Sequence, residues 1–300
     1  MPEMNITQLS RKAMLVKLTQ RKPRLTKRAT SSDEQHIQLE LGDKGAKLYS
    51  TIFIDKYNAV RQLINSASAV YVYHKDHTLP YIDRGPRLLP VAQYESYRDN
   101  VRRLIAEVDA ALVNTMPSYD QHVANDILQR NEAAHAAGKP PRAAVTDYPT
   151  AAQFEESIGS EFFFSPLPDQ SHFLFDVSQE DRDGLNQQLE AAADAARADM
   201  YARIKEPVRH LLSKLKIPAG EPGSVFRDTA VENVIEAIAL VRSLAMGDEQ
   251  ILQMCDEVAT SMSGYARNPQ ILRDSPIVRE QTVARLAAVA DRMGFMFAGN

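Results

Sequence analysis

Apolar residues recur at three- and four-residue spacing along most of the chain, and this pattern predicts a mainly helical protein. One long helix is expected over residues 91–116 and another over 181–215, where the stripe is nearly heptad and Pro207 should produce a kink. These two helices suit an antiparallel, coiled-coil-like arm or bundle. Other helices are predicted at about 55–75, 119–137, 225–246 (capped by Ser224), 247–262 (capped by its first residues) and 276–297.

Short alternating or aromatic-rich runs predict a small antiparallel β-sheet beside these helices. Residues 160–166 (SEFFFSP) and 171–178 (SHFLFDVS) suit a hairpin or two adjacent short strands. Residues 36–41 (HIQLEL) alternate like a strand, and residues 10–18 fit either a strand or a short helix. The expected fold class is therefore α+β, mainly α.

Breaks in the pattern divide the chain into three parts. Residues 1–90 should form an N-terminal α+β segment, 91–216 the long helices that flank the β-hairpin, and 217–300 a C-terminal helical subdomain. The Pro- and Gly-rich break at 216–224 (KIPAGEPGS) sets off the last part, and one continuous domain is the alternative. The apolar stripe of 181–215 can be buried either within the chain or in a dimer.

Composition indicates a globular protein of the cytoplasm. The chain has 300 residues, of which 44% are hydrophobic and 25% charged, enough for a substantial core. No apolar run approaches the ~18 to 20 residues that span a bilayer, and no secretory signal is visible. The single cysteine, Cys255, cannot form an intramolecular disulfide, and its apolar neighbours predict a buried, inert thiol.

Charge is unevenly distributed along the chain, although the net charge is only −4. One stretch carries eight basic residues and no acidic one: Arg11, Lys12, Lys17, Arg21, Lys22, Arg24, Lys27 and Arg28. The other 27 basic residues face 39 acidic ones, which gives the rest of the chain a net charge near −12. The stretch can bind phosphates, but it contains no aromatic residue for base stacking. Docking on an acidic partner, or on the acidic remainder of the chain, is the alternative.

The residues that could perform chemistry form no recognisable site. His74, Asp76 and His77 precede Pro80 and cannot share a helical face, so hydrogen bonds to nearby backbone explain them better than a metal. No phosphate-binding glycine loop, nucleophile elbow, zinc-binding HExxH or CxxC motif occurs. The carboxylates Glu155 and Glu161 have no basic partner nearby in the sequence. We therefore expect no catalytic residue, no metal and no cofactor.

Several motifs, in order, resemble a family of uncharacterised proteins of tailed phages and prophages. They are GAKLYSTIF (45–53), HTLPYIDRGPRLLP (77–90), DYPTAAQFEESIGSEFFFSPLPD (147–169), FRDTAVENV (226–234) and LAMGDEQI (244–251). The similarity extends from about residue 10 to residue 262, and the family often has Trp where this chain has Tyr81. No catalytic residues are established for the family.

The resemblance implies structural roles for a set of motif residues, namely Leu79, Pro80, Gly85, Arg87, Leu88, Leu89, Pro90, Phe226, Arg227, Asp228, Glu232 and Asn233. It also implies gene neighbours that encode MoxR- or CobS-like AAA+ ATPases and von Willebrand A-domain proteins. The first hypothesis is therefore a non-enzymatic adaptor in the cytoplasm of an infected bacterium, bound to such a protein or to itself. A nucleic-acid-binding protein that uses residues 11–28 and a virion structural protein are the alternatives.

Overall fold

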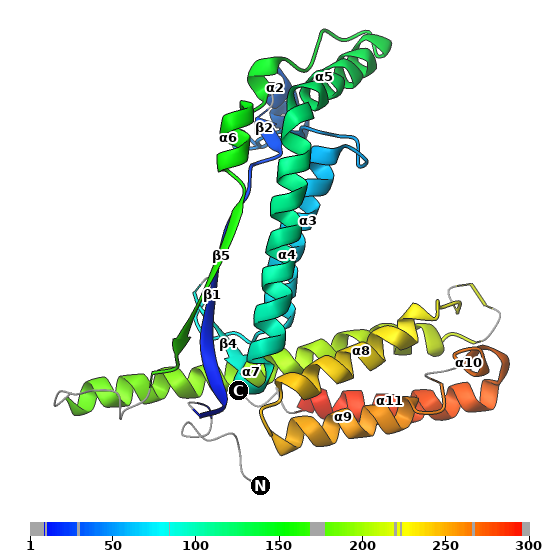
Figure 1. Cartoon of the computed structure of the whole chain (residues 1–300). Helices are drawn as coiled ribbons and strands as arrows, with labels where there is room; N and C mark the ends of the chain where they lie inside the picture. The colour runs from blue at the N-terminus through cyan, green and yellow to red at the C-terminus, as the bar shows by residue number, and fades with distance from the viewer. Residues whose placement is uncertain are drawn as a thin grey trace. The chain divides into compact units, whose positions relative to one another are not determined.

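Helices dominate the computed structural model of the chain, which describes residues 9, 11–28, 31–83, 85–168, 178–218, 221–222, 224–265 and 268–295. Together with a small antiparallel sheet they confirm the expected α+β, mainly α fold (Figure 1). The longest helix, α7 (Gln179–Leu215), has 37 residues and continues through Pro207.

The chain divides into two compact units, and each is assembled from separate stretches of sequence. Unit 1 comprises Met1–Lys17, Lys75–Tyr97 and Phe163–Asn300, and unit 2 comprises Leu18–His74 and Arg98–Phe162. This division differs from the three consecutive parts expected from the sequence, because residues 1–90 and 91–216 each contribute to both units. Four elements have residues in both units: β1 (Ala13–Arg21), α3 (Ala59–Asp76), α4 (Tyr94–Thr115) and β5 (Gly159–Pro166).

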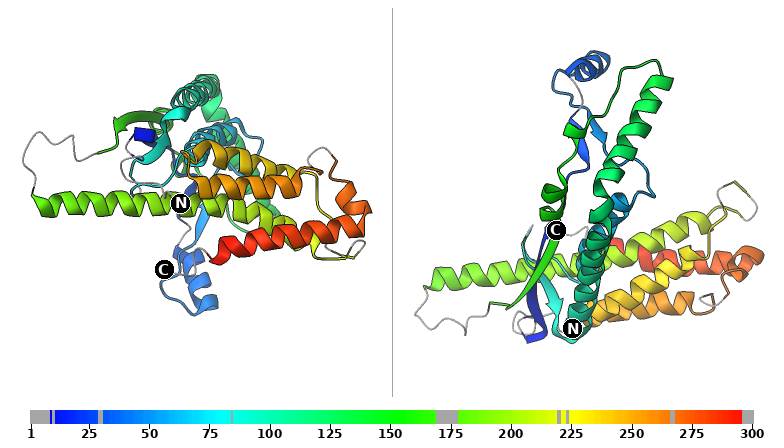
Figure 2. Two further views of the ribbon diagram at one scale, coloured as in Figure 1. Left: turned by 90° about the horizontal axis from the view of Figure 1, so that it is seen from below. Right: turned by 45° about the horizontal axis from the view of Figure 1, so that its top comes forward.

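Unit 1 is built around a bundle of helices that share one apolar core (Figures 1 and 2). The bundle consists of α7, α8 (Thr229–Leu244), α9 (Glu249–Met262) and α11 (Pro276–Phe295), with the short α10 (Ile271–Asp274) beside it. The predicted stripe of α7, from Leu189 to Leu215, is buried inside this unit. Of the two alternatives for the stripe, the structure therefore shows burial within the chain.

Helix α8 begins later than predicted. Its N-cap is Asp228, and Ser224 is a buried residue of the preceding extended segment. The guanidinium of Arg279 donates to the carbonyl of Ser224 and also to the last carbonyls of α7. Arg279 thus bonds both the C-terminus of α7 and the segment that precedes α8. The cap predicted for α9 is confirmed, since Asp248 accepts from the backbone N–H of Gln250 and Ile251.

The sheet has the strand order β4-β1-β5. Strand β4 (Arg87–Pro90) pairs antiparallel with the start of β1, so that Ala13 faces Pro90 and Val16 faces Arg87. For residues 10–18 a strand or a short helix was predicted, and the structure shows a strand there. The first aromatic run forms β5, whereas nearly all of the second, 171–178, lies outside the described residues.

Unit 2 contains the second, two-stranded sheet and a set of shorter helices. The strands are β2 (Thr26–Arg28) and β3 (Tyr49–Thr51), and the helices are α2 (Ser31–Leu41), α5 (Tyr119–Ala136), α6 (Ala151–Glu156) and the residues of α3 and α4 in this unit. The strand predicted at 36–41 is wrong, because this segment is the end of α2. Leu39 and Leu41 are exposed there, so their alternation does not reflect a buried strand face.

Aromatic residues and one buried carboxylate organise the core of unit 2. The ring of Phe53 lies 5.2 Å from that of Tyr148, and the rings of Tyr119 and Phe154 are 4.8 Å apart. Asp126 of α5 is 2% exposed and accepts from the backbone N–H of Phe53 and Ile54 and from the hydroxyl of Tyr148. This carboxylate joins α5 to two segments that are distant in sequence.

Candidate functional site

The two histidines of the 74–77 segment lie in different local structures. His74 belongs to the last turn of α3 and is buried, with its ring 6.4 Å from that of Tyr71. His77 follows the end of the helix. Among the residues that the structure describes, no group of three or more His, Cys, Asp or Glu could hold a metal ion.

The first set of motif residues forms a small, tightly bonded turn in unit 1. Leu79 and Leu88 exchange two backbone hydrogen bonds of 2.8 Å, and the N–H of Gly85 closes the turn on the carbonyl of Ile82. The guanidinium of Arg87 donates to the hydroxyl and the carbonyl of Thr78. Within the same motif, Leu88, Leu89 and Pro90 are buried in β4, and Pro80 is half-buried. These contacts are structural, as the resemblance implies.

The second set divides into buried and exposed positions. Phe226 is buried beneath the guanidinium of Arg273, 4.9 Å from the ring centroid, and Asp228 is ion-paired with that same arginine. Asp228 is itself exposed, and so are the remaining members of the set, before or on α8: Arg227, Glu232 and Asn233. The structure gives these three no role in packing.

The basic stretch is only partly engaged with the rest of the chain. Lys27 forms a 2.5 Å ion pair with Asp147, while Lys12 donates to the carbonyl of Met246 and Lys22 to the hydroxyl of Ser68. The side chain of Arg28 lies outside the described residues. The other four, which are exposed, make no hydrogen bond or ion pair within the described part of the chain: Arg11, Lys17, Arg21 and Arg24.

The environment of Cys255 makes its thiol unreactive. The residue is fully buried in unit 1, and burial raises the pKa of the thiol to about 11. The thiolate is the nucleophilic form, so a thiol with this pKa and no access to solvent is inert at neutral pH. The buried thiol expected from the sequence is confirmed.

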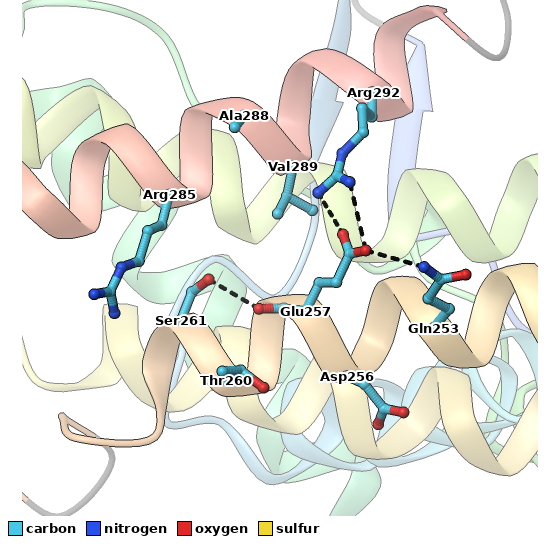
Figure 3. A pocket seen from close by; sticks show the side chains of 9 residues that line it. All are labelled: Gln253, Asp256, Glu257, Thr260, Ser261, Arg285, Ala288, Val289 and Arg292. Atoms are coloured by element: carbon cyan, nitrogen blue, oxygen red, sulfur yellow. Dashed lines mark hydrogen bonds and ion pairs between the residues drawn. The ribbon is translucent and has the colours of Figure 1, made fainter.

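A groove with a volume of about 450 Å³ runs between α9 and α11 on unit 1 (Figure 3). Its apolar lining consists of Val289, which is buried and points toward α9, and Ala288, which is exposed on α11. Its remaining lining consists of Gln253, Asp256, Glu257, Thr260 and Ser261 of α9 and Arg285 and Arg292 of α11. The groove therefore combines apolar surface open to solvent with charged rims, an arrangement typical of protein-binding surfaces.

The charges around the groove are unequally paired. The carboxylate of Glu257 accepts from Arg292 of α11 at 2.5 Å and from Gln253 at 3.3 Å, and both side chains turn toward it in Figure 3. Asp256 forms an ion pair with Arg242 of α8. Arg285 lies at the other end of the groove and makes no hydrogen bond or ion pair within the described residues. One positive charge of the lining is thus left without a partner among the residues that the structure describes.

The sequence contains only part of the signal for this groove. Residues 253, 256, 257, 260 and 261 recur at helical spacing, which places them on one face of α9. Their opposite wall comes from α11, about thirty residues further along the chain, and helical periodicity does not specify which helices are neighbours.

Comparisons with known proteins add no identification. No family model, no curated protein and no solved structure matches the chain. In the described residues no helix has both the length and the apolar character needed to cross a membrane.

Proposed function

We propose that this chain is a non-enzymatic adaptor that binds a partner protein through the groove between α9 and α11. The observation that carries the proposal is the exposed apolar surface of Ala288, three residues from Arg285, whose charge has no ion-pair partner within the described residues. An apolar surface with a charged rim is stabilised when a partner covers it, because apolar area leaves water.

The resemblance to the phage family supports a choice of partner. Its gene neighbours make a MoxR- or CobS-like AAA+ ATPase, or a von Willebrand A-domain protein, the first candidates in the cytoplasm of an infected bacterium. The exposed motif residues Arg227, Glu232 and Asn233 of the α8 region are consistent with an interaction role, since packing does not explain them.

Tagged protein recovered from phage-infected cells after nuclease treatment tests this proposal. Wild type should retain one of the candidate proteins, and Ala288→Glu should lose it, because a carboxylate in the apolar lining of the groove must be desolvated by any partner. Ala202→Glu is the matched control, since it makes the same change at an exposed position of α7 outside the groove. Retention of the partner by Ala288→Glu, or absence of both candidate proteins from the wild-type sample, would count against the proposal.

A second function, nucleic-acid binding, is favoured by the four exposed basic residues that have no hydrogen bond or ion pair in the part of the chain that the structure describes. Arg21 and Arg24 both belong to unit 2 and are exposed, so both can reach a phosphate backbone. Oligonucleotide binding should weaken steeply with salt and fall on replacement of Arg21 and Arg24 by Ala. Lys27 is unsuitable for this test because its charge is engaged by Asp147. Binding that does not respond to salt would remove this candidate.

A further inference from the structure

We infer that the occupant of the groove is an acidic amphipathic helix of about two turns, which places an apolar side chain on Ala288 and a carboxylate against Arg285. The inference deepens the proposed function and rests on it, because it assumes that the groove is the binding surface. Helix-in-groove binding of this kind uses apolar anchors at three- and four-residue spacing.

The dimensions of the groove set the length of the occupant. On α9 the lining extends from Gln253 to Ser261, and on α11 from Arg285 to Arg292. At 1.5 Å per residue, eight residues of helix measure about 12 Å, which corresponds to little more than two turns. A helix laid between two others can pack its side chains into the groove between them.

The apolar lining favours an apolar anchor of some size. Ala288 is small and exposed, so its position leaves space above the backbone of α11. The neighbouring residue, Val289, is buried. The nearby hydroxyl of Ser261 donates to the carbonyl of Glu257 within its own helix at 2.8 Å. The hydroxyl hydrogen is therefore already engaged, and an apolar side chain can cover it without breaking a bond.

The pairing of charges around the groove indicates the sign of the charge that the occupant carries. Both acidic residues of the lining, Asp256 and Glu257, are already ion-paired with arginines. Arg285 is the lining cation without such a partner in the described residues. A carboxylate on the occupant would complete the pairing, whereas a basic occupant would meet an uncompensated positive charge.

Two fluorescent helical peptides that differ only in charge test the inference with the full-length chain. One is a leucine/glutamate amphipathic peptide, and the other carries lysine at each glutamate position. In anisotropy titrations wild type should prefer the glutamate peptide, and Arg285→Glu should weaken its binding about tenfold while strengthening binding of the lysine peptide. Arg209→Glu makes the same charge change at an exposed position of α7, away from the groove, and should alter either affinity less than twofold.

The outcomes separate this inference from the proposed function. Equal binding of the two peptides, or equal effects of Arg285→Glu and Arg209→Glu, would overturn the acidic-helix inference. If Ala288→Glu still abolished capture of the cellular partner, the groove would remain the binding surface and only the chemistry of the occupant would be wrong. If Ala288→Glu changed neither peptide binding nor partner capture, both proposals would fail. Labelling of Cys255 in each variant shows whether the bundle is still folded.

Discussion

The two units of this protein differ in where their buried polar groups lie. In unit 1 the core is apolar, and the buried side chains of Arg279 and Asp248 bond backbone groups at helix ends. In unit 2 a carboxylate inside a helix, Asp126 of α5, is buried and accepts three hydrogen bonds. The first arrangement depends on apolar volume, while the second depends on the correct partners being present.

This difference determines which substitutions each unit tolerates. An apolar core tolerates many side chains of similar volume. A buried carboxylate fixes particular segments, because any donor or acceptor left unpaired is costly. In unit 2 it holds Phe53, whose φ of 53° lies in the left-handed region that a bulky residue rarely adopts. Unit 1 should therefore respond to lost volume and unit 2 to lost hydrogen bonds.

The largest effect is expected from Leu211→Ala near the C-terminal end of α7. Leu211 is fully buried in the core of unit 1, and such a truncation costs about 4 kcal/mol. Cys255, the only cysteine of the chain, lies in the same core and reports its opening. At about 1.4 kcal/mol for each factor of ten, thiol labelling should become faster by up to roughly three orders of magnitude.

Amide hydrogen exchange of unit 2 provides the control for this variant. Protection of the Phe53 and Ile54 N–H groups should change little if the units open separately. Equal loss of protection in both units would show that they open together. The expected difference in how the two units respond would then be wrong.

Asp126→Ala should produce the reciprocal result, with a cost of about 3 kcal/mol. The substitution leaves two backbone N–H groups and the Tyr148 hydroxyl without their acceptor. Exchange at Phe53 and Ile54 should accelerate, while labelling of Cys255 should stay close to wild type. Asp126→Asn preserves shape and one acceptor oxygen and should cost less, about 1 to 2 kcal/mol. Identical losses for Ala and Asn would indicate that volume, and not hydrogen bonding, is what matters at this position.

A smaller effect, about 1 kcal/mol, is expected from the ion pair between Lys27 and Asp147. Burial alone would raise the pKa of Asp147, but the hydrogen bonds from Lys27 and the Ala144 N–H and the nearby positive charges outweigh burial and lower it. A lowered folded-state pKa means that the pair stabilises unit 2 at neutral pH and stops doing so as the pH falls below the usual carboxyl range, about 4.

Denaturation of Lys27→Met, Asp147→Asn and the double variant at two pH values measures this coupling. The interaction energy should be present at pH 7 and smaller at pH 3. A coupling that did not depend on pH would exclude the electrostatic explanation.

The smallest effect belongs to Arg24→Ala, which should change the stability of unit 2 by less than about 0.5 kcal/mol. Arg24 is exposed and forms no bond among the described residues. Its denaturation midpoint is compared with that of Lys27→Met. The comparison distinguishes Arg24 from Lys27, whose charge is paired with Asp147. A large loss with Arg24→Ala would mean that its side chain has a structural partner.

The sequence predicts features that depend on local periodicity and misses those that depend on distant partners. The helices α5, α7 and α9 follow from apolar spacing and nearby caps, and their bounds agree within a few residues. The start of α8 is missed, and the segment before it is bonded to a distant residue, since Ser224 accepts from Arg279, 55 residues away. Asp126 is also missed, since its partners Phe53 and Tyr148 are 73 and 22 residues distant.

The discontinuous composition of unit 1 has a consequence for synthesis on the ribosome. All residues of unit 2 have been made once residue 162 is added, but Leu9 and Leu15 belong to a core that is completed only by α11. Roughly 130 further residues separate these events, which at 5 to 20 residues per second takes about 7 to 26 s. During this interval unit 2 can fold, while Leu9 and Leu15 are still without the later helices that complete their core. A chaperone that binds exposed apolar segments should therefore act on the N-terminal residues of the nascent chain before it acts on unit 2.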